Sequence, residues 1–220
     1  MKDILSKDKY ALPALFAFAL ALRLAYVFHS GRENLSPDAY VWMDTAWSIA
    51  SGNGFGGSWR PPGFAFFLAG IFYAAGKSVL AVQLANCLLG ALTAVFTALT
   101  GTKLFNRRTG LISGALVSFY PYLLAYTRDP ISETFLTFLL SAAILRIVIA
   151  ARQPGLGNYA FAGIVIGLTG LTKSTTLPFF LLACGWLWWQ TGSFRSGLIT
   201  GLFVLLAIAP WTLRNSIFYG

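Results

Sequence analysis

The chain has 220 residues, of which 57% are hydrophobic and 10% charged, and its mean hydropathy is +0.69. These values exclude a soluble domain, because apolar runs long enough to cross a bilayer recur along the sequence. The net charge of +9 comes from basic residues scattered between those runs, which argues against nucleic-acid binding through a basic stripe. Both cysteines lie inside apolar runs and show neither disulfide nor metal-ligand spacing.

The chain begins with a polar, basic tail, residues 1–9, followed by a first apolar run at residues 10–28. This run is longer than the apolar core of a typical signal peptide, and no small-residue cleavage site follows it. We therefore expect an uncleaved first span.

A long polar segment, residues 36–76, follows the first span. Ser36, Pro37 and Asp38 predict a helix start, with a capping hydroxyl, a proline in the first turn and an acid near the positive helix end. The helix is expected to end at the Gly52-Asn53-Gly54 sequence. Its apolar residues at helical spacing predict an amphipathic helix lying on the membrane surface; they are Ala39, Met43, Ala46, Trp47 and Ala50.

A second short helix is expected over residues 63–75, after Arg60-Pro61-Pro62. It is rich in phenylalanine but only marginally long enough to span, so we place it in the membrane interface. Six further spans are predicted at residues 79–99, 111–126, 131–150, 159–171, 177–189 and 198–211. The sequence thus predicts an all-α, polytopic membrane protein, a single module of residues 1–220 with seven transmembrane helices and two interfacial helices in the first outer loop.

The distribution of basic residues supports this topology. With a cytoplasmic N-terminus and an outer C-terminus, the positive-inside rule is obeyed; the inner basic residues are Lys2, Lys7, Lys9, Lys103, Arg107, Arg108, Arg146, Arg152 and Arg195. If residues 63–75 crossed the membrane, Arg107 and Arg108 would face outward, against the rule. Every acid beyond the N-terminal tail then lies on the outer side, where several basic residues join them.

Each of these charged residues also has a structural explanation. Asp38 suits a helix N-terminus, Arg128 and Asp129 suit a surface ion pair, and Lys173 suits a helix C-terminus. Their gathering on one membrane face nevertheless favours a site. A carboxylate can act as a general base toward a hydroxyl, cations can bind a phosphate leaving group, and the apolar helices can hold a lipid tail.

The sequence resembles the GT-C superfamily of membrane glycosyltransferases, in its protein-mannosyltransferase and aminoarabinose-transferase-like branch. The matching stretches are PDAYVWMDTAWSIASGNGF, WRPPGFAFFLAGIFYAAG, FNRRTGLISGALVSFYPYLLAYTRDPISETF, GIVIGLTGLTKST and APWTLRNSIFYG. The resemblance implies transfer of a sugar from a polyprenyl-phosphate-linked donor to an acceptor hydroxyl on the outer face of the cell membrane, with inversion at the anomeric carbon. The acceptor could be a protein, a glycolipid or a glycan.

The resemblance also implies roles for single residues. Asp38 matches the acid of the first outer loop that acts on or positions the acceptor, and Glu133, or less well Asp129, matches a second acidic position. Arg60 matches a basic residue that contacts the donor phosphate. Lys173 and Arg214 match basic positions at outer span ends, and Arg128 joins them as a candidate phosphate-binding residue.

This chain departs from the family pattern in two respects. Family members often have two adjacent acids where this chain has Asp38 followed by Ala39, so no metal site is assigned and a divalent cation is left open. Family members also continue beyond this module, and we therefore expect a missing C-terminal part or a partner subunit that supplies it. The alternatives are a transporter or flippase for a lipid-linked substrate and a non-catalytic subunit with the same fold.

Overall fold

The computed structural model describes residues 10–30, 34–56 and 60–219, and all regular elements in this part of the chain are helices. They are α2 (Ala11–Ser30), α3 (Pro37–Ala50), α4 (Pro62–Ala75), α5 (Val79–Leu104), α6 (Arg107–Phe119), α7 (Pro121–Arg128), α8 (Ser132–Arg152), α9 (Leu156–Thr172), the 3-10 turn η1 (Ser174–Thr176), α10 (Leu177–Thr191) and α11 (Phe194–Tyr219). The all-α prediction is confirmed. The predicted cytoplasmic tail, residues 1–9, lies outside the described residues.

Four of the described helices, α2, α5, α8 and α11, are long and apolar enough to cross a membrane. The pair α6 and α7, bent by 50° at its break, would make a fifth span if it crosses as one. Helices α4 and α9 are apolar but shorter, and α10 has 15 residues. The prediction of a multi-pass membrane protein is therefore confirmed, while the number of seven spans stays a prediction.

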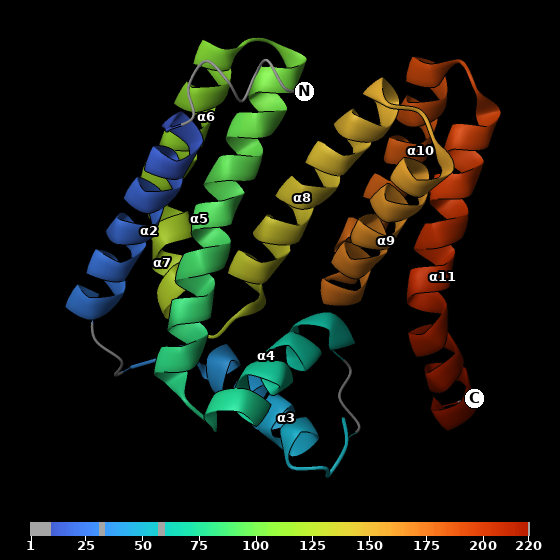
Figure 1. Cartoon of the computed structure of the whole chain (residues 1–220). Helices are drawn as coiled ribbons and strands as arrows, with labels where there is room; N and C mark the ends of the chain where they lie inside the picture. The colour runs from blue at the N-terminus through green and yellow to red at the C-terminus, as the bar shows by residue number, and fades with distance from the viewer. Residues whose placement is uncertain (1–9, 31–33, 57–59, 220) are drawn as a thin grey trace.

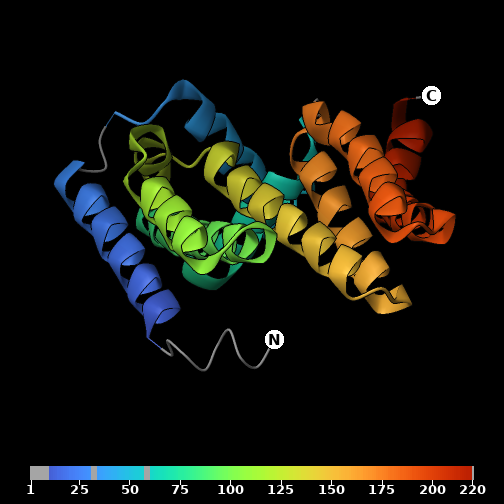
Figure 2. The same ribbon diagram turned by 90° about the horizontal axis from the view of Figure 1, so that it is seen from above.

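Helix α8 lies between two groups of helices. Seen from above, α2, α5, α6 and α7 gather on one side of α8, and α9, α10 and α11 on the other (Figure 2). Small residues permit the closest contacts, as expected for helices in a bilayer. At Gly163 of α9, for example, a Cβ would lie 2.4 Å from the Thr200 carbonyl oxygen of α11, so a larger residue there would push the two helices apart.

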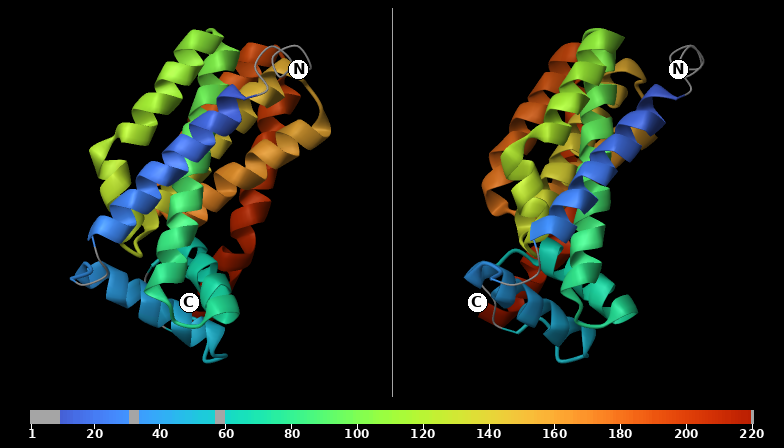
Figure 3. Two further views of the ribbon diagram at one scale, coloured as in Figure 1. Left: turned by 60° about the vertical axis from the view of Figure 1, so that its left-hand side comes forward. Right: turned by 90° about the vertical axis from the view of Figure 1, so that its left-hand side faces the viewer.

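Helices α3 and α4 pack against each other across one end of this bundle (Figures 1 and 3). Their shared core contains Trp42, Phe64 and Phe72, and the Trp42 and Phe64 rings meet edge to face with centroids 5.2 Å apart. This core continues into the bundle, where Phe135 of α8 and Trp211 of α11 pack against it. The two helices are thus fixed to the ends of the bundle helices by aromatic packing, and their position in the membrane interface stays a prediction.

The predicted start of α3 is confirmed, and the face that α3 buries against the protein coincides with the predicted apolar face only in part. The Ser36 hydroxyl accepts from the Ala39 N–H at 3.4 Å, with Pro37 in the first turn, and the helix ends at Ala50 before Gly52 and Gly54, which have φ angles of 83° and 80°. Of the predicted apolar face, Ala39, Met43 and Ala46 are buried and Trp47 is 40% exposed, whereas Trp42, which was not assigned to that face, is 4% exposed. The buried face is set by packing on α4, which turns Trp42 inward.

The predicted span at residues 111–126 is broken. Helix α6 begins earlier, where the Asn106 side chain caps the Thr109 N–H at 3.0 Å, and ends at Phe119. Pro121 then starts α7, and Tyr120 before it is extended, as a residue preceding proline prefers. The bend of 50° follows from this proline.

The ends of the helices separate the charged residues as the sequence predicts. The ends that carry Lys103, Arg107 and Arg152 lie at the end of the bundle opposite α3 and α4 (Figure 1). There the Arg152 guanidinium donates to the Lys103 carbonyl oxygen. Which end faces the cytoplasm stays a prediction.

Candidate functional site

The charged residues singled out by the sequence lie at the end of the bundle that α3 and α4 cover. This end contains the start of α3, the start of α4, the turn from α7 to α8, the end of α9 and the last turns of α11 (Figures 1 and 3). Residues far apart in the sequence are therefore brought to one end of the fold. The contacts among them decide which belong to one site.

Asp38 and Arg60 form an ion pair at this end of the bundle. The Arg60 Nη2 atom lies 2.5 Å from Asp38 Oδ1, and the indole N–H of Trp42 donates to Asp38 Oδ2 at 3.0 Å. The Arg60 guanidinium also stacks over the Trp42 ring, 4.7 Å from its centroid. Trp42 thus holds both members of the pair, because it contacts the carboxylate through its N–H and the cation through its face.

The surroundings of Asp38 favour its ionised form. The hydrogen bond from Arg60 is the largest cause that holds the pKa of Asp38 below its usual value, and the Arg60 charge, the Trp42 N–H and the Lys173 charge act in the same direction. Partial burial opposes them and is outweighed. Asp38 is therefore a carboxylate at neutral pH, available as a proton acceptor but partly neutralised by its cation.

A second ion pair lies nearby. Lys173, which follows the last turn of α9, places its Nζ atom 3.1 Å from Glu133 Oε1 in the first turn of α8. The Ser132 hydroxyl lies 3.4 Å from the other oxygen of Glu133. Because the charge of Lys173 also lowers the pKa of Asp38, the two ion pairs are within electrostatic reach of each other.

Arg60 lines a cavity of about 580 Å³. The cavity lies between the start of α4, the end of α9, the start of α10 and the last turns of α11, and Arg60 is its one charged lining residue in the described part of the chain. The other residues that line it are Pro61, Pro62, Gly170, Leu171, Ser174, Leu177, Ile208, Trp211, Thr212, Asn215 and Tyr219. A cavity of this size accommodates a sugar phosphate, with both hydroxyl and amide groups and apolar groups on its walls.

The remaining predicted site residues lie outside this arrangement. Asp129 offers its backbone carbonyl to the Asn86 amide of α5 at 3.2 Å, and no hydrogen bond joins it to Asp38 or Glu133 in the described part of the chain. The Arg128 Nη2 atom lies 3.5 Å from the Asn34 carbonyl oxygen. Arg128 thus contacts the first loop, and Asp129 contacts α5.

Arg214 is surrounded by aromatic rings. Its guanidinium lies 4.7 Å from the Trp211 ring centroid, 4.8 Å from Phe218 and 5.7 Å from Phe55, and it reaches the Gly56 carbonyl oxygen at 3.5 Å. These contacts fasten the loop after α3 to α11. Arg214 does not line the cavity.

The sequence interpretation missed Trp42 as a site residue. Its signal was nevertheless present, because residues 38 and 42 are four positions apart and share one face of a helix. It also missed the polar lining contributed by Ser174, Thr212 and Asn215, whose grouping depends on how α9, α10 and α11 pack.

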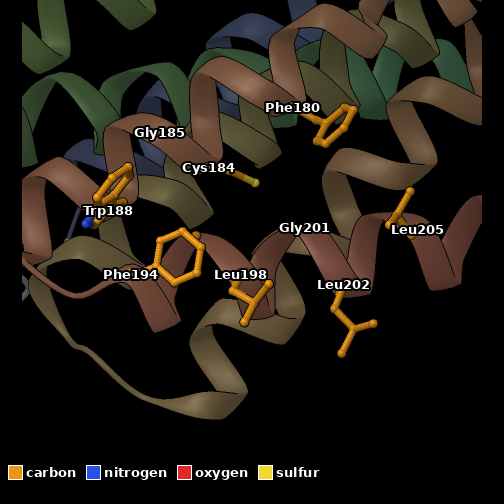
Figure 4. Close-up of a pocket in the computed structure, with 10 residues that line it drawn as sticks. Phe180, Cys184, Gly185, Trp188, Phe194, Leu198, Gly201, Leu202 and Leu205 are labelled. Atoms are coloured by element: carbon orange, nitrogen blue, oxygen red, sulfur yellow. The ribbon is translucent and has the colours of Figure 1, made fainter.

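A second, apolar groove runs between α10 and α11. It has a volume of about 360 Å³, and Figure 4 shows the side chains that line it from both helices, with Cys184 at its centre. On α11 the lining residues Leu198, Leu202 and Leu205 of this groove are followed at helical spacing by Ile208 and Thr212, which line the Arg60 cavity. The two hollows therefore follow one another along the same helix.

The described residues contain no group of three or more histidine, cysteine, aspartate or glutamate side chains that could hold a metal ion. The charged groups of the site instead form two acid–base pairs, Asp38 with Arg60 and Glu133 with Lys173.

Comparison with known proteins identifies the family. The profile of the dolichyl-phosphate-mannose-protein mannosyltransferases matches residues 59–213, more than half of the chain, and this range includes Arg60, Glu133 and Lys173. No significant match was found among curated proteins or among solved structures. The match confirms the GT-C resemblance that the sequence motifs suggested. The chain belongs to the dolichyl-phosphate-mannose-protein mannosyltransferase family.

Proposed function

We propose that the chain transfers a sugar from a polyprenyl-phosphate-linked donor to an acceptor hydroxyl at the end of the bundle covered by α3 and α4. The observation that carries the proposal is the position of Arg60, which pairs with Asp38 and also lines the cavity of about 580 Å³. One cation thus connects a candidate base to a space that fits the donor headgroup. The family match supports the reaction class.

The donor phosphate binds Arg60 in this proposal. A guanidinium can donate to two acceptors, and a phosphate that enters the cavity competes with Asp38 for it. As Arg60 moves toward the phosphate, Asp38 loses the interaction that most lowers its pKa, and it becomes a stronger base. Donor binding and activation of the base are therefore coupled through one residue.

The chemical step then exchanges one bond for another. The acceptor oxygen attacks the anomeric carbon, its proton passes to the Asp38 carboxylate, and the bond from the anomeric carbon to the phosphate oxygen breaks. The electron pair of that bond leaves on the polyprenyl phosphate, whose charge Arg60 neutralises, with Lys173 as a second cation nearby. Inversion requires the attacking and leaving oxygens on opposite faces of the sugar, so Asp38 acts from the face opposite the phosphate once Arg60 has turned away from it.

The Glu133–Lys173 pair has a supporting role in this scheme. Glu133 holds Lys173 at 3.1 Å, so the Lys173 charge stays close to Asp38 and to the leaving phosphate. Arg128 and Arg214 are assigned to holding the first loop on the bundle, because they contact Asn34 and Gly56 of that loop. Asp129 is assigned to joining the turn before α8 to α5, because its backbone carbonyl accepts from Asn86.

The lipid tail of the donor follows the apolar groove between α10 and α11 (Figure 4). This placement rests on the shared face of α11, which leads from Leu198 at one end to Thr212 beside the Arg60 cavity. In the same proposal the chain crosses the membrane seven times, with α6 and α7 as one span and the site on the outer face. A transporter, the alternative left open by the sequence, has no support from the family match.

The experiment is transfer of mannose from polyprenyl-phosphate-linked mannose to added acceptors by the purified protein in lipid nanodiscs. Variants Asp38→Ala and Arg60→Ala are compared with Lys77→Ala, a matched control in which an ion pair of 2.7 Å with Asp44 is lost at the same end of the bundle. We expect both site variants to lose transfer at least about a hundredfold, the usual contribution of a general base or a charge-stabilising donor. Equal activity in Asp38→Ala and the control would remove Asp38 from the mechanism.

A further inference from the structure

Arg23 is a buried cation that the proposed reaction does not use. It lies in α2, its side chain is fully buried, and no carboxylate contacts it in the described part of the chain. A charge at membrane depth is costly and is kept only where it contacts polar partners or backbone carbonyls. Its partners therefore indicate what it does.

Arg23 reaches the point where the third predicted span is broken. Its Nη1 atom donates to the Ala19 carbonyl oxygen in its own helix at 3.0 Å, and its Nη2 atom lies 3.5 Å from the Val117 carbonyl oxygen of α6. In a continuous helix the Val117 carbonyl would accept from the N–H of residue 121. Residue 121 is proline and has no N–H, so the Val117 carbonyl lacks the partner that it would have in a continuous helix.

Gly90 of α5 leaves the space that the Arg23 side chain occupies. A Cβ at Gly90 of α5 would lie 2.2 Å from Arg23 Nε, so any side chain there would displace the guanidinium. Among the described residues the Nε atom has no hydrogen-bond partner, and Arg23 lines a cavity of about 10 Å³, which is close to the smallest volume that holds one water molecule. Thr93, Thr134 and Thr137 line that cavity and offer hydroxyl oxygens as acceptors for such a water.

The segment beyond the break carries Glu133, which pairs with Lys173 in the proposed site. Helix α7 leads to Asp129 and Glu133, and its last carbonyls accept from two buried amides of α5, Gln83 to Arg128 at 2.9 Å and Asn86 to Thr127 at 3.4 Å. The Thr134 hydroxyl in the first turn of α8 donates to the Tyr126 carbonyl at 3.0 Å. The position of α7 therefore sets the position of Glu133 and, through it, of Lys173.

We propose that Arg23 is a positioning residue: it supplies the hydrogen bond that Pro121 cannot make, keeps the α6–α7 break in its bent form, and so fixes the turn that presents Glu133 to Lys173. The catalytic part of this statement rests on the proposed function. The structural part, that Arg23 and Pro121 act together on one carbonyl, does not.

The test is a double-mutant comparison of Arg23→Met and Pro121→Ala, singly and together, in nanodiscs. Amide hydrogen exchange of residues 122–131 is the readout. We expect Arg23→Met to speed exchange there by about tenfold or more, the factor that corresponds to loss of one charge-assisted hydrogen bond. In the Pro121→Ala background the same substitution should have little effect, because an alanine at that position has an N–H that can donate to the Val117 carbonyl.

Two further variants separate hydrogen bonding from mere filling of space. Arg23→Lys keeps a donor and a charge and should retain most of the protection, whereas methionine, of similar length and apolar, should not. Arg146→Met is the matched control, since Arg146 is a second arginine within a span, stacked 4.4 Å over the Phe161 ring of α9. Should Arg23→Met fail to fold, recovery of folding in the Arg23→Met, Pro121→Ala double variant supports the proposal in the same way, and failure of both variants to fold contradicts it.

Equal acceleration of exchange in both proline backgrounds, or none in either, would overturn the assignment of Arg23. The proposed function is judged separately by polyprenyl phosphate binding to the wild-type protein. If exchange responds as expected but polyprenyl phosphate does not bind, Arg23 still holds the break and the transferase proposal fails.

Discussion

Replacement of Asp38 by asparagine should change donor binding and sugar transfer in opposite directions. Asparagine keeps the size of the side chain and can still accept from the Trp42 N–H, but it removes the charge that pairs with Arg60. Asp38 then no longer competes with the donor phosphate for Arg60, while no carboxylate remains at position 38 to accept the acceptor's proton. Binding should improve as transfer is lost.

The magnitude of the binding change follows from the exposure of the pair. The Arg60 and Asp38 side chains are 31% and 49% exposed, so the pair contributes about 0.2–1 kcal/mol, as measured for exposed ion pairs. Its removal should therefore tighten binding of polyprenyl phosphate by a factor of about 1.4 to 5. Loss of a general base should lower the transfer rate by roughly 10²- to 10⁴-fold.

The assay is a titration of the nanodisc-embedded protein with polyprenyl phosphate, alongside transfer from polyprenyl-phosphate-linked mannose under saturating donor. Asp44→Asn is the control, because it removes the equivalent charge from the Lys77 pair. Weaker binding in Asp38→Asn would refute the competition for Arg60. Unchanged transfer would refute the role of Asp38 as base.

Three further predictions concern the same end of the molecule. Trp42→Phe keeps an aromatic ring in the α3–α4 core but loses the N–H that donates to Asp38. Transfer should therefore fall several-fold, and the free energy of unfolding should fall by about 1 kcal/mol. Unchanged transfer would show that the indole N–H is dispensable. Glu133→Gln should reduce transfer while leaving polyprenyl phosphate binding intact, because Lys173 loses its anchor but keeps its charge; abolished binding would place Glu133 in the donor site instead. The stability that Asp38 gains from Arg60 should be constant between about pH 5 and 8, because Asp38 is ionised there in both the folded and the unfolded chain. It should be lost only below the ordinary pKa of 3.8, as the pH falls through the lowered pKa of Asp38 in the folded state. Unfolding curves of wild type and Arg60→Ala at several pH values test this, and a gap that closes near about pH 6 would contradict it.

Local chemistry made some features of the site predictable from the sequence. The start of α3 could be read from Ser36, Pro37 and Asp38, because capping involves residues within one turn. The gathering of acids at one end of the bundle followed from the alternation of apolar runs with charged residues. The family could be recognised because five stretches occur in the expected order.

Other features depend on contacts between distant elements. Arg60 meets Asp38 only because α3 folds back on α4, and this packing also decides that Trp42, not Trp47, is buried. The environment of Arg214 requires Phe55 from the first loop to reach α11. A helix break could be expected at Pro121 from the sequence. The contact of Arg23 with the Val117 carbonyl could not, because these two residues are 94 positions apart in the chain.

The central claim is that Arg60 binds the phosphate of a lipid-linked donor, and the most direct test is equilibrium binding of polyprenyl phosphate to the wild-type protein, Arg60→Ala and Lys77→Ala. We expect saturable binding to the wild type and to Lys77→Ala. Affinity should fall about tenfold to a hundredfold in Arg60→Ala, as expected when a charge-assisted hydrogen bond of about 1.5–3 kcal/mol is removed. Equal affinity of all three proteins, or binding by none, would contradict it.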